Sequence, residues 1–265
     1  MKIKIMKISL FFLLSAPLLS ISQEISTVSQ DNSFFKYDLT SLEKPGLCRE
    51  IIDAISITDP ELKFSGLNKA IPLARIEDFL QYSKIDMFFC MLKTDERIKK
   101  FNFIDIPLYS INHVIISKSN DDILKNPNLN LYEISKLGTI LVNKGSALVG
   151  DLKTQGVKFQ SGAKDDLQIL DMLEKNRGRF YYAQDMTARY VLQKSKLNHK
   201  YSIYPQVFKT EQQLIAYSKK VNPKVVLKVT EAIKKLQKQG KLKALYQRYA
   251  FNNSLNDQNF IVQYE

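Results

Sequence analysis

The chain has 265 residues, of which 45% are hydrophobic and 25% are charged. These values are ordinary for a globular protein and exclude a largely disordered chain, while the length suits one two-lobed unit or two small domains. A net charge of +12 would allow contact with anionic lipid, cell-wall polymer or an acidic ligand. Because the lysines are scattered along the chain, we interpret them as a solvated basic surface.

Residues 1–22 have the three-part pattern of a secretory signal peptide. Three lysines precede an apolar run of about 12 residues, and Ser20 to Ser22 then presents small residues to a signal peptidase. The run is shorter than the roughly 20 residues that span a bilayer, which disfavours an uncleaved membrane anchor. We predict export to the periplasm with cleavage before Gln23, and export makes nucleic acid a poor candidate partner.

Residues 25–92 alternate between strand and helix patterns. The sequence predicts strands over 25–28 and 61–67, and helices over 48–57 and 75–83 with apolar residues at helical spacing. Residues 87–92 form a continuous apolar run, which is typical of a strand buried on both faces, as in a parallel sheet. This order predicts a doubly wound α/β sheet.

A second alternation follows Tyr109 and ends in helices. Asn222 and Pro223 are a good helix start, and Gly240 is placed to end that helix. No Pro- or Gly-rich linker separates the blocks, so we expect two lobes joined by strand-like crossovers. The predicted strands span 113–117, 139–142, 180–183, 201–204 and 214–217, and the predicted helices span 166–176 and 186–193.

Residues with catalytic or metal-binding chemistry are few. The two histidines, His113 and His199, have no cysteine or carboxylate at metal-ligand spacing, and we interpret both as structural. Two Ser-x-x-Lys matches, at residues 41–44 and 161–164, lie in loop contexts and are expected by chance in a lysine-rich chain. The sequence therefore predicts no catalytic residue, no metal site and no cofactor.

A block between residues 85 and 109 carries a resemblance to a known family. It contains Ile85-Asp86 before the apolar strand, then Leu-Lys-Thr-Asp-Glu-Arg at 92–97, then Phe-Ile-Asp-Ile-Pro-Leu-Tyr at 103–109. This block resembles the signature of the family 3 bacterial extracellular solute-binding proteins, which include the polar amino acid binders of ABC importers. Weaker matches at 178–179, 184–185 and 232–249 extend the resemblance over nearly the whole mature chain.

The resemblance implies the type 2 periplasmic-binding fold, in which two doubly wound lobes are joined by a hinge and lobe 1 is discontinuous. The expected division is a signal peptide at 1–22, the first part of lobe 1 at 23–109, lobe 2 at 110–212, and the second part of lobe 1 at 213–265. The chain would be a monomeric binding protein without catalysis. It would capture a small amino-acid-like ligand for an ABC permease or a sensor.

Two alternatives stay open at this point. The first is an enzyme on the same fold, either dehydratase-like or related to the cell wall, because fold does not fix function. The second is an orphan sensory or binding domain. A pair of acid and base residues in the cleft would favour the enzyme, and the sequence offers no convincing pair.

Transferred to this sequence, the family's ligand contacts fall on two charged residues. Arg97 would grip the α-carboxylate of the ligand and Asp185 would accept its ammonium group. Arg97 could instead cap a loop or pair with a neighbouring acidic residue, and Asp185 could be a helix N-cap. The remaining expected ligand-binding residues are Thr94, Lys93, Gly145, Ser146, Ala147, Phe34 and Tyr109.

The chain has two cysteines, Cys48 and Cys90. An even count in an exported protein indicates a disulfide. Cys48 lies at the start of the helix after the first strand, and Cys90 lies near the end of the third strand. Both positions fall at the same edge of a doubly wound sheet. We therefore predict a bond between them, and the resemblance supports it through similar cysteine contexts in related solute-binding proteins.

Overall fold

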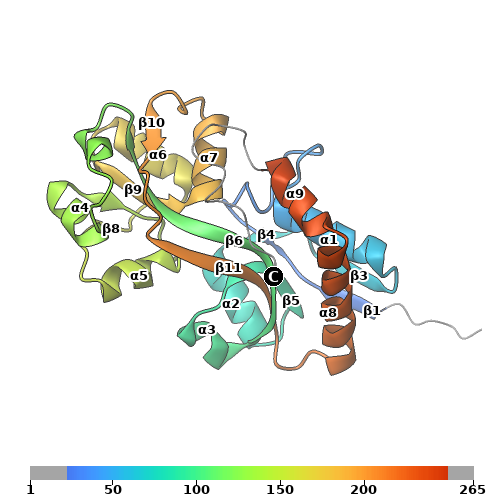
Figure 1. The fold of residues 1–265 in the computed structure, drawn as a ribbon. Helices are drawn as coiled ribbons and strands as arrows, with labels where there is room; N and C mark the ends of the chain where they lie inside the picture. The colour runs from blue at the N-terminus through green and yellow to red at the C-terminus, as the bar shows by residue number, and fades with distance from the viewer. Residues whose placement is uncertain (1–22, 250–265) are drawn as a thin grey trace, which may run out of the picture.

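The computed structural model describes residues 23–249, which form two lobes side by side (Figure 1). The predicted signal peptide lies outside these residues, as does the end of the chain. One hydrophobic core draws its residues from 25–111 and 215–249, together with Met186. Two adjoining clusters draw theirs from 114–204. We call the first body lobe 1 and the second lobe 2.

Lobe 1 begins with two short parallel strand pairs. β1 (Gln23–Ser26) pairs with β3 (Leu62–Ser65), and β2 (Ser29–Gln30) pairs with β4 (Ala70–Ile71). The other elements of this part are α1 (Leu47–Thr58), α2 (Leu73–Gln81), β5 (Met87–Leu92) and α3 (Asp95–Lys100).

Two long strands run from one lobe into the other. β6 (Asn102–Lys118) and β11 (Lys209–Tyr217) pair antiparallel from Lys209↔His113 to Tyr217↔Asn102. β11 also pairs antiparallel with β5 in lobe 1, while β6 pairs with β9 (Phe180–Gln184) in lobe 2. The two crossings of the chain between the lobes are thus hydrogen-bonded to each other. The lobe boundaries that we predict at 109/110 and 212/213 fall on this paired stretch.

Lobe 2 completes the main sheet. Its strand order continues from β6 through β9 and β7 (Ile140–Leu141) to β8 (Phe159–Gln160), and β10 (Tyr201–Ile203) pairs with the far end of β6. The surrounding helical elements are a 3-10 turn (Asp122–Lys125), α4 (Leu131–Leu137), α5 (Leu148–Thr154), α6 (Asp166–Glu174) and α7 (Asp185–Lys194).

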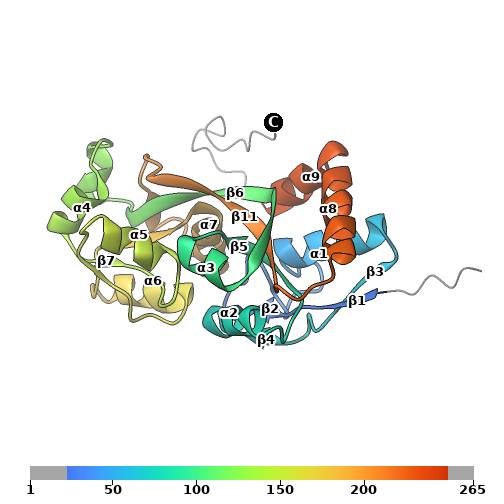
Figure 2. The same cartoon turned by 90° about the horizontal axis from the view of Figure 1, so that it is seen from below.

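The last two helices return to lobe 1. α8 (Pro223–Lys238) and α9 (Lys241–Tyr249) lie against α1, far from lobe 2, as the turned view shows (Figure 2). Asn222 caps α8 by accepting a hydrogen bond from the Lys224 backbone N–H, and Gly240 has a φ of 68° between the helices. The sequence pattern predicts both features.

Most predicted elements are present, with ends that shift by a few residues. Two expectations differ from the structure. The strand predicted at 113–117 extends back to Asn102 as β6; its first half is only partly buried where it leaves lobe 1, so it lacks the continuous apolar pattern of 113–117. β5 is buried along its whole length as expected, but its partner in the main sheet, β11, is antiparallel. The sheet is therefore mixed.

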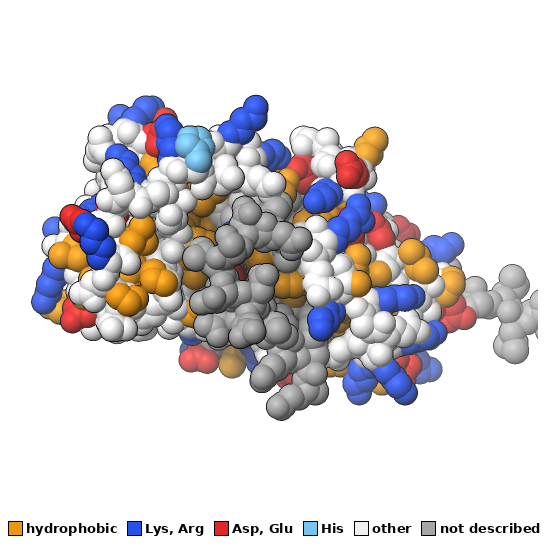
Figure 3. Space-filling model, turned by 45° about the horizontal axis from the view of Figure 1, so that its top comes forward, with side chains coloured by type: hydrophobic (Ala, Val, Ile, Leu, Met, Phe, Trp, Pro, Cys, Tyr) orange, Lys and Arg blue, Asp and Glu red, His pale blue; other side chains and the backbone are white. Residues whose placement is uncertain are grey.

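Basic side chains are dispersed over the face seen in Figure 3 and do not gather in one patch. This distribution agrees with a solvated basic surface. Within residues 23–249 no helix combines the length and apolar character that crossing a membrane requires.

The structure contains the predicted disulfide. Cys48 lies in the first turn of α1 and Cys90 lies in β5; the bond joins them over a Cα–Cα distance of 6.1 Å and a sequence separation of 42. Cys90 has a φ of 64°, in the left-handed region that non-glycine residues rarely adopt, and the pairing of β11 with β5 shifts register beside it.

Replacing both cysteines by alanine should lower the free energy of unfolding by about 2–4 kcal/mol, because the bond closes a long loop in the unfolded chain. Chemical denaturation of the two forms measures this loss. In the same comparison, Cys48→Ala with Cys90→Gly should be the more stable double variant, since glycine tolerates the positive φ. Thiol titration of the unfolded, unreduced parent should find no free thiol; a finding of two would contradict the bond.

Candidate ligand-binding site

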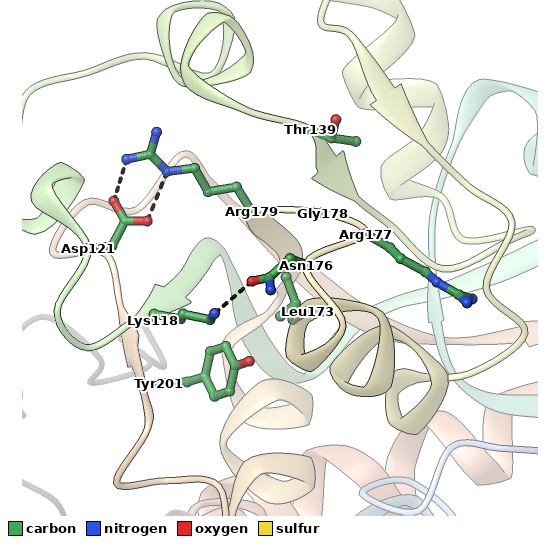
Figure 4. A pocket seen from close by; sticks show the side chains of 9 residues that line it. All are labelled: Lys118, Asp121, Thr139, Leu173, Asn176, Arg177, Gly178, Arg179 and Tyr201. Carbon is green, nitrogen blue, oxygen red and sulfur yellow. Dashed lines mark hydrogen bonds and ion pairs between the residues drawn. The ribbon is translucent and has the colours of Figure 1, made fainter.

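Two sizeable cavities open on the described part of the chain. The smaller, about 350 Å³, lies within lobe 2. Figure 4 shows that most of its charged groups are already engaged: Arg179 pairs with Asp121 and Lys118 donates to the amide oxygen of Asn176, while Arg177 points away. The larger, about 480 Å³, is walled by both lobes. Pockets between two bodies are the preferred places for small ligands, so we take the larger cavity, called the cleft below, as the candidate site.

Lobe 1 contributes three segments to the cleft, and lobe 2 contributes a loop, a helix start and a strand end. The residues from lobe 1 are Gln30 to Ser33, Lys36, Pro72 to Ala74, Met91, Leu92 and Arg97. Those from lobe 2 are Asn143 to Leu148, Lys164, Asp166, Tyr181 to Gln184 and Thr187.

Asp166 is the buried acid of the cleft. It opens α6, where Asp165 is the N-cap, and its side chain accepts hydrogen bonds at Oδ1 from Tyr181 and from the Asn143 amide. Burial raises the pKa of Asp166, although the hydrogen bonds from Tyr181 and Asn143 act against this rise. Asn143 also keeps a buried Oδ1 for which residues 23–249 provide no donor. Lobe 2 thus presents a cluster of acceptors.

Lys36 is the buried base on the lobe 1 side. Gly46 is the N-cap of α1 and has no side chain to cap it, and the first turn of that helix donates instead to the carbonyls of Phe35 and Lys36. Gly46 has a φ of 103°, and a Cβ there would lie 2.3 Å from the Lys36 carbonyl oxygen, so only glycine allows this approach. The helix start therefore fixes the Lys36 backbone beside the cleft.

The charge of Lys36 is poorly compensated. Its Nζ donates to the carbonyl of Cys90 at 2.8 Å and to Gln213 Oε1 at 3.3 Å, both neutral acceptors. Burial lowers the pKa of Lys36 to about 7, and the positive charge of Arg97 adds to the effect while Asp166 opposes it.

Arg97 lines the cleft as the resemblance implies, but its guanidinium group already has partners within lobe 1. Nε and Nη2 donate to Glu77 Oε1 at 3.1 and 2.8 Å, and Nη1 donates to the Leu92 carbonyl at 2.8 Å. Three of its five N–H groups are therefore used within lobe 1. The pairing with Asp95 or Glu96 that the sequence left open is replaced by this bond to Glu77 on α2.

Asp185 lies outside the cleft lining. It opens α7 and is 1% exposed, and its carboxylate accepts from the Asn112 backbone and side chain and from the Met186 N–H. Burial raises the pKa of Asp185, while the bonds from Asn112 lower it. Because Asn112 belongs to β6, the carboxylate fastens α7 to the crossing strand. The N-cap of α7 is Gln184, so Asp185 is the first residue of the helix and not the N-cap that the sequence left open, and it does not line the cleft.

The remaining expected residues divide between the cleft and other places. Gly145, Ser146 and Ala147 line the cleft before α5. The others do not: Thr94 caps α3, Lys93 pairs with Asp105 on the surface, Tyr109 is buried between Phe35 and Tyr246, and Phe34 lies under the Lys194 ammonium.

A polar contact ties the two lobes together near the cleft. Asp38 of lobe 1 is 2% exposed and accepts from Tyr190 at 2.9 Å and Lys194 at 3.0 Å, both on α7 of lobe 2. Burial alone would raise the pKa of Asp38, but hydrogen bonds from Thr40, Lys194 and Tyr190 lower it to about 2.

Asp38→Asn should lower the free energy of unfolding at neutral pH by about 1–3 kcal/mol, because Lys194 loses its buried partner. The native pKa of Asp38 lies below its ordinary value, so its contribution is complete above about pH 4 and disappears as the pH falls towards about 2. Urea titrations across this range measure the change. Asp122→Asn, which breaks an exposed pair with Lys125, should cost far less, because water screens that pair. If both variants lose the same free energy of unfolding, the buried contact between Asp38 and α7 does not stabilise the protein as we expect.

Lys36→Met should stabilise the protein without ligand by about 1–4 kcal/mol below about pH 7, because it removes a poorly paired buried charge. The native pKa of Lys36 is lower than its value in the unfolded chain. The native state therefore binds fewer protons between about pH 7 and 10, and the stability of the parent rises across that window. Melting temperatures should show the advantage of Lys36→Met shrinking there. If Lys36→Met is less stable than the parent at every pH, the buried charge of Lys36 does not destabilise the protein without ligand, and the prediction is wrong.

Known proteins resemble this chain in fold. An ancestral arginine-binding protein bound to arginine has a TM-score of 0.70 at 20% identity, covering 87% of this chain and 100% of its own. A substrate-binding protein of an ABC uptake transporter from Streptococcus pneumoniae with bound histidine has 0.68 at 18%, covering 89% and 95%. A histidine kinase sensor domain with similarity to periplasmic binding proteins has 0.71 at 12%, covering 87% and 97%.

These similarities confirm the type 2 periplasmic-binding fold that the sequence predicts. Among curated proteins, no sequence matches the chain. The model of the bacterial extracellular solute-binding proteins, family 3, matches residues 45–253. This match covers most of the chain, and the protein therefore belongs to family 3 of the bacterial extracellular solute-binding proteins.

Proposed function

We propose that this protein captures an amino-acid-like zwitterion in the cleft and presents it to an ABC permease or a sensor, without chemical change of the ligand. One observation carries the proposal: a buried carboxylate from lobe 2 and buried cationic groups from lobe 1 line the same cavity. A zwitterion can pair with both walls at once, and closing the lobes around it removes water from both pairs.

The ammonium group of such a ligand would find its acceptors on the lobe 2 wall. Asp166 uses Oδ1 for its bonds to Tyr181 and Asn143, so its second oxygen can accept from an ammonium group. The buried Oδ1 of Asn143 lies on the same wall and supplies a further acceptor. An ammonium group has three N–H donors and needs such a set. We therefore assign to Asp166 the role that the family resemblance gave to Asp185.

The predicted location of the protein and its structural neighbours support the same ligand class. The signal peptide that the sequence predicts would direct the mature chain to the periplasm, where it would meet small solutes. Two of the structural neighbours hold arginine and histidine, which are zwitterions of the kind proposed. Likeness to a sensor domain leaves the receiving partner as either a permease or a sensor. We propose that the protein acts as a monomer, needs no cofactor and does not bind nucleic acid.

The test compares two buried aspartates of lobe 2 that both open helices. Thermal-shift screening with the common L-amino acids should find a stabilising ligand, since binding to the native state raises stability. Asp166→Asn should then weaken binding by roughly 30- to several-thousand-fold, because a desolvated ammonium loses its counter-charge. Asp185→Asn should keep the affinity within about threefold and lose stability instead.

Calorimetry on both variants, with circular dichroism to confirm folding, decides between the two aspartates. Loss of binding in Asp185→Asn alone would return the role to that residue and reject our assignment. Unchanged binding in both would show that no ammonium group is held here. If no amino acid stabilises the parent, the amino-acid class of ligand is wrong.

A further inference from the structure

Lys36 lies on the cleft wall opposite Asp166, two residues after Phe34, and the resemblance does not mark it as part of the site. Its side chain is 8% exposed and lines the cavity. Phe35 and Tyr37 on either side are buried in the lobe 1 core, and the start of α1 holds its backbone. The packing of its neighbours and the hydrogen bonds to its backbone thus fix Lys36 beside the cleft.

Lys36 pairs with no acid of the described residues, 23–249. Within residues 23–249, no carboxylate oxygen lies at ion-pair distance from Lys36 Nζ, and its two acceptors are the Cys90 carbonyl and Gln213 Oε1. An ammonium group has three N–H donors, so one remains for a partner in the cavity. A buried charge without a counter-charge is costly, and such groups recur where a ligand supplies what is missing.

Besides Lys36, the Lys, Arg and Asp residues that line the cleft are Asp31, Arg97, Lys144, Lys164 and Asp166. Arg97 on α3 is already paired with Glu77 of α2 at 2.8 Å, and its positive charge still helps to lower the pKa of Lys36. Asp166 on α6 lies across the cleft and attracts Lys36 without contacting it. Asp31, on the same segment as Lys36, also lines the cleft but is exposed to water. Lys36 is therefore the buried cation of lobe 1 with no acid of its own.

We infer that Lys36 binds the carboxylate of the ligand and that the ligand's arrival is coupled to uptake of one proton by this lysine. The inference rests on the proposed function of the cleft and extends it: the ligand must carry an acidic group, and Arg97 alone does not recognise it. The Arg97–Glu77 pair then shapes the wall and offers its two remaining N–H groups as further donors.

The proton balance follows from burial. The pKa of Lys36, lowered to about 7 mainly by burial, leaves the amine largely neutral at about pH 8. A carboxylate that enters beside it raises this pKa, so the amine takes a proton from the buffer and becomes the ammonium group of the complex. Asp166, whose pKa burial raises, would contribute only the opposite change, release of a proton. Uptake at about pH 8 therefore reports Lys36.

The experiment is calorimetry with the L-amino acid that stabilises the parent most in the thermal-shift screen. Titrations at about pH 8 in two buffers of different ionisation enthalpy count the protons, and the parent should take up close to one per ligand. Lys36→Met should bind at least about 30-fold more weakly and take up none. Lys36→Arg, which stays charged, should bind more tightly than Lys36→Met but also without uptake. The control is Lys224→Met, at an exposed lysine in the first turn of α8. It should match the parent in affinity and in proton uptake.

Two outcomes would overturn the inference while leaving the amino-acid function intact. They are parental affinity in Lys36→Met, and binding by the parent without proton uptake at about pH 8. A lysine that served only to hold Cys90 and Gln213 would give the second result.

If no amino acid binds, the proposed function fails and Lys36 is tested by itself. Lysine labelled with ¹³C at Cε gives an NMR signal for Lys36, identified by its loss in Lys36→Met. Sodium acetate, compared with sodium chloride at equal concentration, should raise the titration midpoint of this signal by at least about half a pH unit. An unchanged midpoint would overturn the inference.

Discussion

The pairing of β6 with β11 is the constraint on which the geometry of the cleft depends. The chain passes between the lobes in these strands, and they are hydrogen-bonded to each other across the passage. A paired ribbon can twist and bend, but it prevents the lobes from sliding apart. Lys36 belongs to lobe 1 and Asp166 to lobe 2, so their separation is set by how this ribbon bends. A small flexure there becomes an opening or closing movement at the cleft, which is the hinge type of domain motion.

Polar groups buried along the ribbon show how its lobe 2 end is held. His113 of β6 lies 3.0 Å from Glu211 of β11 and 3.1 Å from the hydroxyl of Tyr182, which itself lines the cleft. Burial would raise the pKa of Glu211, but bonds with His113 and Lys209 lower it to about 2, so the acid is charged at neutral pH. Asp185 adds a further attachment between α7 and β6. These contacts make the lobe 2 wall one body with the strand that leads to the hinge.

The sequence allowed the fold to be predicted well because its signals are local or belong to a family motif. The caps of α8, the apolar run of β5 and the cysteines at one sheet edge follow from propensity, burial and topology. Arg97 and the turn at 145–147 could be placed on the cleft because they follow strands at its edge. What could not be predicted was the direction in which a given side chain points.

Asp166 and Asp185 illustrate that limit. Each is an aspartate at the start of a helix in lobe 2, and each is buried. The packing of that helix against its neighbours decides which one meets the cavity, and that packing depends on residues distant in sequence, such as Asn112. Lys36 left a fainter signal, a lysine among Phe34, Phe35 and Tyr37. A charge within an aromatic run is unusual in a core, and it could have marked the position for attention.

The cleft contains three buried charged side chains, Arg97, Lys36 and Asp166. They differ in how their charges are compensated within the protein, and this difference has consequences for specificity. Arg97 is neutralised in advance by Glu77, whereas Lys36 and Asp166 are both pushed towards their neutral forms by burial. A ligand with only an amine or only an acid would relieve one group and leave the other buried and uncompensated. A zwitterion of the right length relieves both, so its two charges reinforce each other's binding. Discrimination against singly charged solutes would then come from the penalty left behind in the protein, which is the more effective way for a buried site to reject a near match.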